Sequence, residues 1–359
     1  MPNLEVSFLF PEKNWAKNDL LDEFDLEKLN DAVNDLFFNE ICFGLTYAFE
    51  VIFLGRQIIK RFAEYKFNWG NSKEFITPET KFCSWSVAKS VLNCVVGVMV
   101  KKQLVHLDEK LDFKEWSRGD ERRNITINHL LTMTDGLCFN ENYEDFNTSD
   151  VINMLFGSGK DDVGAFMLDK KLVHCPGEVF NYSSGSTNLC SYYLGSKFKH
   201  SSEFLEFIKK EIFNPLGTFS FEFGLDKAGT WIASSYLYGT IDDYARIGYL
   251  YLRNGKWKNL QILPTSWVQY STEPRNLDPT NNQYYGAGWW NLMDSFGTYY
   301  AAGYEGQLIL VVPALDLVVV RLGKSEINQE REVLNFMKNF IEMFSEIHNR
   351  ITHLRQQFL

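Results

Sequence analysis

A serine and a lysine stand three residues apart in the segment FCSWSVAKS, which covers residues 82–90. On a helix this spacing brings the side chains of Ser86 and Lys89 onto one face. The run that follows is apolar, so we expect the lysine to be buried, and burial lowers the pKa of an amine because it disfavours the charged form. A neutral amine beside a hydroxyl can accept its proton, so the pair predicts a nucleophile and its base.

The same two residues also have a purely structural interpretation. Ser86 would then cap the N-terminus of a helix while Lys89 extends its ammonium group to solvent. A second pair with the same spacing, Ser196 and Lys199, lies in a polar, basic run and is interpreted as a solvated helix end. The spacing alone does not decide between a catalytic pair and a structural one.

Two further segments hold residues of chemical interest. Tyr182 lies in PGEVFNYSSGSTNLCSYYLG (residues 176–195), after an extended stretch and before a predicted helix. The segment GYEGQ (residues 303–307) precedes the apolar run LILVVP, and glycines at a strand edge allow a ligand to approach the backbone closely. Taken singly, a packed loop tyrosine and a plain turn would also explain these segments.

Hydrophobic periodicity predicts the elements that position these residues. Residues 25–38 have the pattern of an amphipathic helix, and residues 45–62, with Gly55 and Arg56 at a turn, have that of a β-hairpin. The residues after Ser86 are apolar nearly all round, which is typical of a buried helix. Helical patterns and Gly-, Pro- and Asn-rich loops fill residues 103–265. Four short strands follow between residues 284 and 323, then a helix over 329–344 and a further helical stretch.

This order of elements predicts an α+β fold. Strands from both ends of the chain are expected to pair in one antiparallel sheet flanked by helices, with a mainly helical insertion between them. We predict a discontinuous sheet domain (1–102 and 266–359), a helical domain (103–265) and an active site at the seam. A chain of 359 residues has the length for one large or two closely joined domains.

Composition and charge exclude several classes of function. The net charge of −10 and the lack of a long basic run argue against nucleic-acid binding. No segment approaches 18 continuous apolar residues, so no membrane span is expected, and no signal peptide is visible, which predicts a cytoplasmic location. The six scattered cysteines predict reduced thiols. The six histidines lack metal-binding spacing, so we expect no metal and no cofactor, and His129 is interpreted as a structural loop or helix-start residue.

Taken together and in order, several motifs resemble a known family. They are SWSVAKS, HLLTMTDGL, PGEVFNYSSG, DDYARIGYLYLRNGKW, YGAGWW and GYEGQLILVVPALDLVVV. The set is similar to the serine hydrolases related to class C β-lactamases, which include D-alanyl-D-alanine carboxypeptidases, family VIII esterases and 6-aminohexanoate-dimer hydrolases. The resemblance covers about residues 45–325 and implies the β-lactamase/transpeptidase-like fold.

The resemblance implies an acyl-enzyme mechanism with assigned residues. Ser86 is expected to be the nucleophile, Lys89 its proton partner, and Tyr182 the relay that protonates the leaving group. The backbone N–H groups of Ser86 and Gln307 are expected to form the oxyanion hole. The resemblance does not decide whether Lys89 or Tyr182 is the base during acylation. The candidate substrate contacts are Ser184, Tyr304, Glu305 and Gly306.

Two departures from the β-lactamase pattern affect the expected substrate. Ser184 replaces the asparagine of the family's Tyr-x-Asn motif, and residues 304–306 read Tyr-Glu-Gly in place of Lys-Thr-Gly. The cation that would hold a β-lactam carboxylate is therefore missing, and Glu305 is expected to repel one. These differences favour a small-molecule ester or amide as substrate. The alternatives are a β-lactamase or D-amino-acid peptidase, and a catalytically silent binding or scaffold protein; the oligomeric state stays open.

Overall fold

The computed structural model describes residues 8–64, 66–69 and 72–357. Its α-helices are α1 (Glu23–Phe38), α2 (Glu40–Phe43), α3 (Val87–Lys101), α4 (Ile127–Leu131), α5 (Asp150–Phe156), α6 (Val163–Leu168), α7 (Ser184–Gly195), α8 (Ser201–Ile208), α9 (Asn214–Leu216), α10 (Ile241–Leu252), α11 (Thr265–Thr272) and α12 (Ile327–Gln357). Turns of 3₁₀-helix lie at Glu121–Asn124, Tyr304–Gly306 and Pro313–Leu315, and a π-helical turn lies at Lys209–Phe213.

A nine-stranded sheet forms the centre of the fold, in the order β1-β3-β2-β16-β15-β14-β13-β12-β11. Its strands are β1 (Ala16–Lys17), β2 (Leu45–Phe53), β3 (Arg56–Phe62), β11 (Asn276–Asp278), β12 (Gln283–Tyr285), β13 (Trp290–Asn291), β14 (Tyr299–Gly303), β15 (Gln307–Val312) and β16 (Leu317–Lys324). All neighbours are antiparallel except β1 and β3. The strands come from the two ends of the chain, as predicted.

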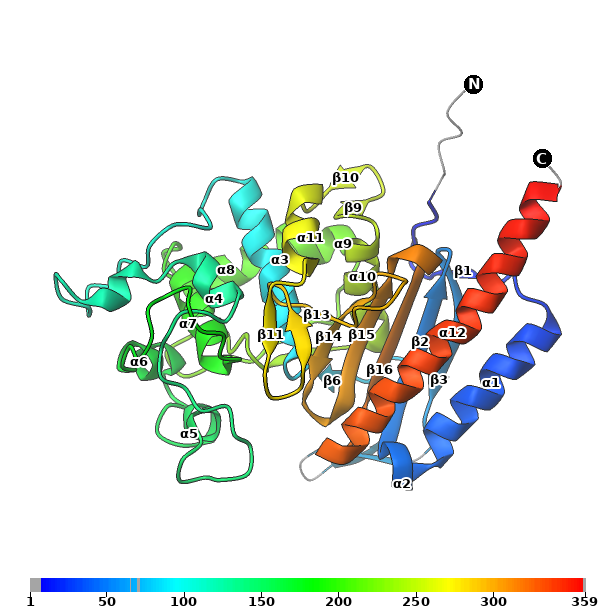
Figure 1. Ribbon diagram of the computed structural model, residues 1–359, viewed down its shortest axis with the longest axis horizontal. Helices are drawn as coiled ribbons and strands as arrows, with labels where there is room; N and C mark the ends of the chain where they lie inside the picture. The colour runs from blue at the N-terminus through cyan, green and yellow to red at the C-terminus, as the bar shows by residue number, and fades with distance from the viewer. Residues whose placement is uncertain (1–7, 65, 70–71, 358–359) are drawn as a thin grey trace.

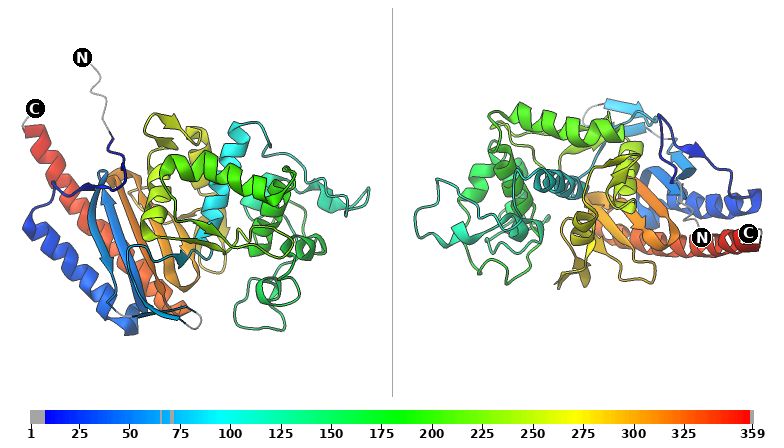
Figure 2. Two further views of the ribbon diagram at one scale, coloured as in Figure 1. Left: turned by 180° about the vertical axis from the view of Figure 1, so that it is seen from behind. Right: turned by 90° about the horizontal axis from the view of Figure 1, so that it is seen from above.

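Helices cover both faces of this sheet (Figures 1 and 2). On one face α12 packs its aromatic side chains against β2, with Phe340 on Phe49 and Phe344 on Phe53, and α1 lies beside α12. On the other face lies α10, where Gly248 allows the helix to approach the side chains of β15 and β16 closely. The central strands β2, β15 and β16 are therefore buried along nearly their whole length and are mostly apolar on both faces of the sheet.

Helix α3 lies where the sheet meets the helical part of the chain (Figure 1), in contact with β14, β15 and α7. Every residue from Val87 to Met99 is buried, which confirms the prediction of a buried helix. Since a helix enclosed on all sides is fixed by its surroundings, the residues in its first turn have well-defined positions. Ser86 and Lys89 are among these residues.

Several elements differ from the prediction. The end of the chain forms one continuous helix, α12, because no glycine or proline interrupts the pattern after residue 344. The strand expected near residues 284–293 is divided into β12 and β13, at a turn where Gly288 has a φ of +86°. The middle of the chain also contains strands: β8 (Leu237–Gly239) pairs with both β6 (Phe82–Cys83) and β7 (Glu222–Phe223), and β9 (Lys256–Trp257) pairs with β10 (Leu260–Gln261). A separate hairpin, β4 (Lys66–Trp69) and β5 (Ser72–Phe75), follows β3.

The proposed division into two domains stays a prediction. Helix α10 belongs to the predicted helical domain by residue number, yet it packs on β2, β15 and β16. The six cysteines are free thiols. His129 accepts a hydrogen bond from the backbone N–H of Thr126 and so helps to cap α4, which confirms its structural interpretation. Across residues 8–64, 66–69 and 72–357, no helix is long and apolar enough to cross a bilayer, and no cluster of potential metal ligands is present.

Candidate active site

Ser86 lies in a tight turn between β6 and α3. The turn is fixed at Ser84, which is fully buried and hydrogen-bonds through both its backbone N–H and its hydroxyl to the carbonyls of Leu237 and Ser235. Trp85 then adopts a φ of +44°, a conformation that is costly for a bulky residue and persists only where the surroundings enforce it. Here its indole ring contacts Tyr304 edge-on, and its Nε1–H donates to Glu305. The strained turn directs the Ser86 hydroxyl into the cavity.

Lys89 hydrogen-bonds to this hydroxyl. Its Nζ lies 2.8 Å from Ser86 Oγ, 3.1 Å from Ser184 Oγ and 3.0 Å from the carbonyl oxygen of Ser234. The side chain is only 3% exposed, and burial lowers its pKa to about 8, against the opposing effect of the Glu141 carboxylate. The Ser86 side chain makes no capping bond to α3. The structure thus excludes a capping serine with a solvated lysine.

Tyr182 approaches the same hydroxyl from the loop before α7. Burial raises its pKa well above the ordinary value, while a hydrogen bond with Ser86 lowers it in part. Its ring packs on Trp290 and Tyr285, with centroids 5.3 and 5.7 Å away, and Lys89 Nζ lies 5.0 Å from the ring centroid. At neutral pH Tyr182 is therefore a protonated phenol beside an amine whose pKa is near 8.

The edge of β14 lies directly against the nucleophile turn. A Cβ atom on Gly303 would stand 2.5 Å from the carbonyl oxygen of Ser84 and 3.2 Å from the backbone nitrogen of Ser86, so only glycine permits this approach. The next residues, 304–306, form a turn with Glu305 at a φ of +64°. The buried guanidinium of Arg321 holds this turn by donating to the carbonyls of Glu305 and Gly306, each at 3.0 Å.

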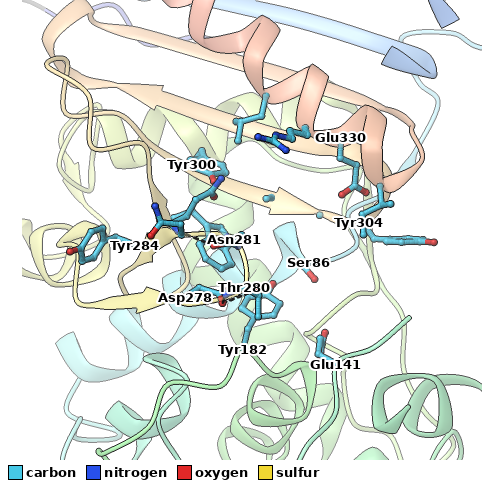
Figure 3. Close-up of a pocket in the computed structure, with 18 of the residues that line it drawn as sticks. Ser86, Glu141, Tyr182, Asp278, Thr280, Asn281, Tyr284, Tyr300, Tyr304 and Glu330 are labelled. Atoms are coloured by element: carbon cyan, nitrogen blue, oxygen red, sulfur yellow. Dashed lines mark hydrogen bonds between the residues drawn. The ribbon is translucent and has the colours of Figure 1, made fainter. Parts of the chain in front are cut away.

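Four of the predicted site residues line one cavity of about 1660 Å³ (Figure 3). Ser86, Tyr182, Tyr304 and Gly306 line it. Ser184 is buried beneath the surface of the cavity, where it contacts Lys89.

Two sequence-based assignments do not match the cavity. Glu305 is not a lining residue, because its carboxylate turns toward Trp85 Nε1 and lies 3.9 Å from Lys324 Nζ. Gln307 is buried at the start of β15, opposite Gly303, and its side chain hydrogen-bonds to the backbone of Gly323. Gln307 is also absent from the cavity lining, whereas Gly303 and Tyr304 are present. Of this segment, Gly303, Tyr304 and Gly306 line the cavity, whereas Glu305 and Gln307 do not.

Sequence reasoning missed Glu141, which hydrogen-bonds to Ser184 and lies close enough to Lys89 to raise the pKa of that lysine. Its carboxylate accepts hydrogen bonds from the backbone N–H of Ser184 at 2.8 Å, from Ser184 Oγ at 2.5 Å and from the hydroxyl of Tyr143 at 2.6 Å. It thus lies at the N-terminus of α7, where negative charge is favoured. The loop that carries it is 43 residues away from Ser184 in the sequence, so no local pattern could reveal the contact.

In the part of the chain that the structure describes, aromatic and carboxamide side chains are the most numerous in the cavity lining, and five carboxyl groups accompany them. In Figure 3, Glu330 of α12 and Glu141 lie on either side of Ser86. Burial raises the pKa of Glu330 to about 7. The cationic side chains among the described lining residues are Arg331 and Lys338, and both are exposed on α12. The aromatic lining residues are Phe139, Tyr143, Phe180, Tyr182, Tyr284, Trp290, Tyr300 and Tyr304.

A comparison of the sequence with models of known protein families, and of the fold with solved structures, identifies the class of this protein. The sequence model of the β-lactamase family matches residues 58–338, so the chain belongs to the β-lactamase family and is a serine hydrolase of that type. No curated protein sequence matches significantly.

Solved structures share the fold at low sequence identity. A Bacillus anthracis protein assigned as a 6-aminohexanoate-dimer hydrolase has a TM-score of 0.70 at 20% identity, covering 89% of this chain and 82% of its own. A penicillin-binding protein homologue from Pyrococcus abyssi has a TM-score of 0.64 at 20% identity, with 84% and 74% covered. Simvastatin synthase (LovD) from Aspergillus terreus has a TM-score of 0.66 at 14% identity, with 91% and 100% covered. At these identities the likeness concerns the fold alone, which is β-lactamase/transpeptidase-like.

Proposed function

We propose that the protein hydrolyses carboxylic esters or amides of small molecules through an acyl-enzyme intermediate on Ser86. The observation that supports this most directly is the 2.8 Å contact between Lys89 Nζ and Ser86 Oγ, made by a lysine that is 3% exposed. A buried amine with a pKa of about 8 is partly neutral at physiological pH and can serve as a general base.

In the proposed acylation step, Lys89 accepts the Ser86 proton as Oγ attacks the substrate carbonyl carbon. Tyr182 keeps its proton at neutral pH because burial raises its pKa, so it is the better donor to the leaving group. After donation, Tyr182 recovers a proton from Lys89. Water then attacks the acyl-enzyme by the reverse sequence of proton transfers, which releases the acid and restores Ser86.

Negative charge on the substrate oxygen needs fixed N–H donors. The Ser86 backbone N–H is one proposed donor. For the second we propose the N–H of Tyr304 in place of that of Gln307, because Tyr304 lines the cavity directly after Gly303, whereas Gln307 does not line it.

The cavity lining supports a preference for esters and simple amides over β-lactams. A β-lactam carries a carboxylate that needs a cationic partner close to the nucleophile. The lining residues near Ser86 include Ala302, Gly303, Tyr304 and Glu141, none of which is cationic.

A serine-directed fluorophosphonate probe tests the proposal. We expect the wild-type protein to be labelled and to turn over a short-chain nitrophenyl ester, and Ser86→Ala to lose both. Ser196→Ala is the matched control, because Ser196 belongs to the second serine–lysine pair and is exposed. Equal labelling of wild type and Ser86→Ala would place the nucleophile elsewhere.

A substrate panel then separates the alternatives. Faster turnover of a chromogenic cephalosporin than of esters and amides would favour a β-lactamase. Failure of the probe to label folded wild-type protein, together with no turnover, would favour a binding protein.

A further inference from the structure

The hydrogen-bond partners of Lys89 determine where the lone pair of its neutral amine points. A neutral amine has two N–H donors and one lone pair, whereas the ammonium form has three donors. Lys89 Nζ has three oxygen neighbours: Ser86 Oγ, Ser184 Oγ and the carbonyl oxygen of Ser234. The carbonyl oxygen can only accept, so one N–H of the neutral amine is committed to it.

The Ser184 hydroxyl decides where the second N–H points. A hydroxyl has one proton, and the Ser184 proton is donated to Glu141 Oε1 at 2.5 Å. With its proton on Glu141, Ser184 Oγ offers only lone pairs to Lys89, so it must accept the second N–H. The remaining lone pair of Lys89 then faces Ser86 Oγ, the atom that must lose a proton.

Glu141 is itself fixed in place. Its other carboxylate oxygen accepts from the backbone N–H of Ser184 at 2.8 Å, so the carboxylate binds both donors of one residue at the start of α7. Ser184 is 1% exposed, which keeps water from competing for its hydroxyl.

We propose that Glu141 is a positioning residue that acts through the Ser184 hydroxyl to aim the lone pair of Lys89 at Ser86. This inference rests on the proposed acylation of Ser86 and assigns a role to a carboxylate that the proposed mechanism does not otherwise use. Without the Glu141 acceptor, the Ser184 hydroxyl can donate its proton to Lys89 instead. The lone pair of the amine then accepts this hydrogen bond and no longer faces Ser86.

The test measures kcat/KM for a nitrophenyl ester and the rate of fluorophosphonate labelling in Glu141→Gln, Ser184→Ala and the double variant. We expect each single variant to lose about 10- to 100-fold in kcat/KM through kcat, the range typical of positioning partners. The double variant should lose no more than the worse single variant, because Glu141 acts through Ser184. Glu178→Gln, which removes an exposed carboxylate from the loop before Tyr182, is the control with the same charge change.

Losses that multiply in the double variant would overturn the proposal, as would wild-type rates in Glu141→Gln. If Glu141→Gln fails to fold, Ser184→Ala decides alone: unchanged kcat/KM in that variant would also overturn it.

A second readout is the pH profile. Removing the Glu141 charge should move the acidic limb of kcat/KM to lower pH, because the carboxylate raises the pKa of Lys89. The loss of kcat/KM should persist on the alkaline plateau, where Lys89 is neutral in both wild type and variant, and this remaining loss reports the positioning. If Ser86→Ala keeps its activity, the proposed function itself fails; if only the Glu141 and Ser184 variants behave as wild type, the inference alone fails.

Discussion

At the scale of single residues, the proposed mechanism makes the reactivity of Ser86 depend on the charge state of Lys89. The Lys89 pKa of about 8 lies well below the ordinary lysine value because the side chain is buried. At pH 7 roughly a tenth of the lysine is neutral at this pKa, against far less than a thousandth for a solvated lysine. The burial of one amine therefore gives a gain in active base of more than 100-fold.

This shift predicts a pH dependence. The neutral amine is the reactive form, so kcat/KM should rise about tenfold per pH unit below the Lys89 pKa and level off above pH 8. The measurement is the pH profile of kcat/KM between pH 5.5 and about 9.5 in buffers that keep the protein folded. A profile that is flat through this range would contradict the role of Lys89 as base.

Substitution of the lysine gives the second residue-scale prediction. Lys89→Ala should lower the rate of fluorophosphonate labelling by about 10²–10⁴-fold, the usual worth of a general base. The folded state should survive, because the substitution removes a buried ionisable group at the cost of a small cavity. Thermal unfolding of the variant separates the two effects, and near-normal labelling would remove Lys89 from the mechanism.

Sequence reasoning found Ser86 and Lys89 because a helix fixes the relative positions of residues three apart. It could not find Glu141, whose place depends on how a loop folds onto the start of α7. It also assigned Glu305 and Gln307 to the cavity, since a sequence shows the order of a turn but not which side of it faces inward. The left-handed conformation at Glu305 and the ladder position of Gln307 turn both away from the cavity lining.

At the scale of elements, the site is the meeting of the β6–α3 turn with the edge of β14. Gly303 sets the distance between them, since any Cβ there would overlap the carbonyl oxygen of Ser84. The predicted glycine-flanked strand edge was therefore a correct signal. The group that approaches Gly303 closely is the backbone of the turn at Ser84 and Ser86, and not a ligand. The sequence could not specify which group this would be.

Gly303→Ala should displace β14 from the nucleophile turn. We expect kcat for the ester to fall by at least about 10-fold, because misplacing a reacting group by about 1 Å can cost about 100-fold. The change is checked by steady-state kinetics together with urea unfolding. Gly195→Ala is the control, since a Cβ there meets only Phe204, at an ordinary 3.7 Å. An unchanged kcat in Gly303→Ala would show that β14 does not contribute to the site.

At the scale of the whole molecule, the sequence predicted that both chain ends build one sheet. Alternating or continuous apolar runs identify β2, β3, β15 and β16 without knowledge of their partners. Strand order and helix placement do not follow from such patterns, because they depend on contacts between distant segments. The position of α10 on the sheet is an example.

Arg321 connects these distant parts. Its guanidinium is fully buried on β16 and donates to the carbonyls of Phe43 and Leu45, before and within β2, as well as to the turn at residues 304–306. Arg321→Met should lower the free energy of unfolding by about 2–4 kcal/mol, since several buried carbonyls lose their donor.

Urea unfolding checks this value. Lys324→Met on the same strand is the control: its ammonium is exposed and lies 3.9 Å from Glu305, so we expect a change below about 0.5 kcal/mol. A stability of Arg321→Met equal to that of Lys324→Met would mean that the buried guanidinium does not hold the two chain ends together.

The pairing of β2 with β16 also has a consequence for biosynthesis. A nascent chain that has emerged only as far as α3 already carries Ser86 and Lys89, but β14, β15 and β16 are still to be translated. Until β14, β15 and β16 have been translated, β14 cannot pack against the turn that carries Ser86. The edge of β2 that later pairs with β16 is also unpaired and can associate with other polypeptides. We therefore expect the proposed reactivity of Ser86 to appear late, once the ribosome has released β16, and chaperones to matter most before that point.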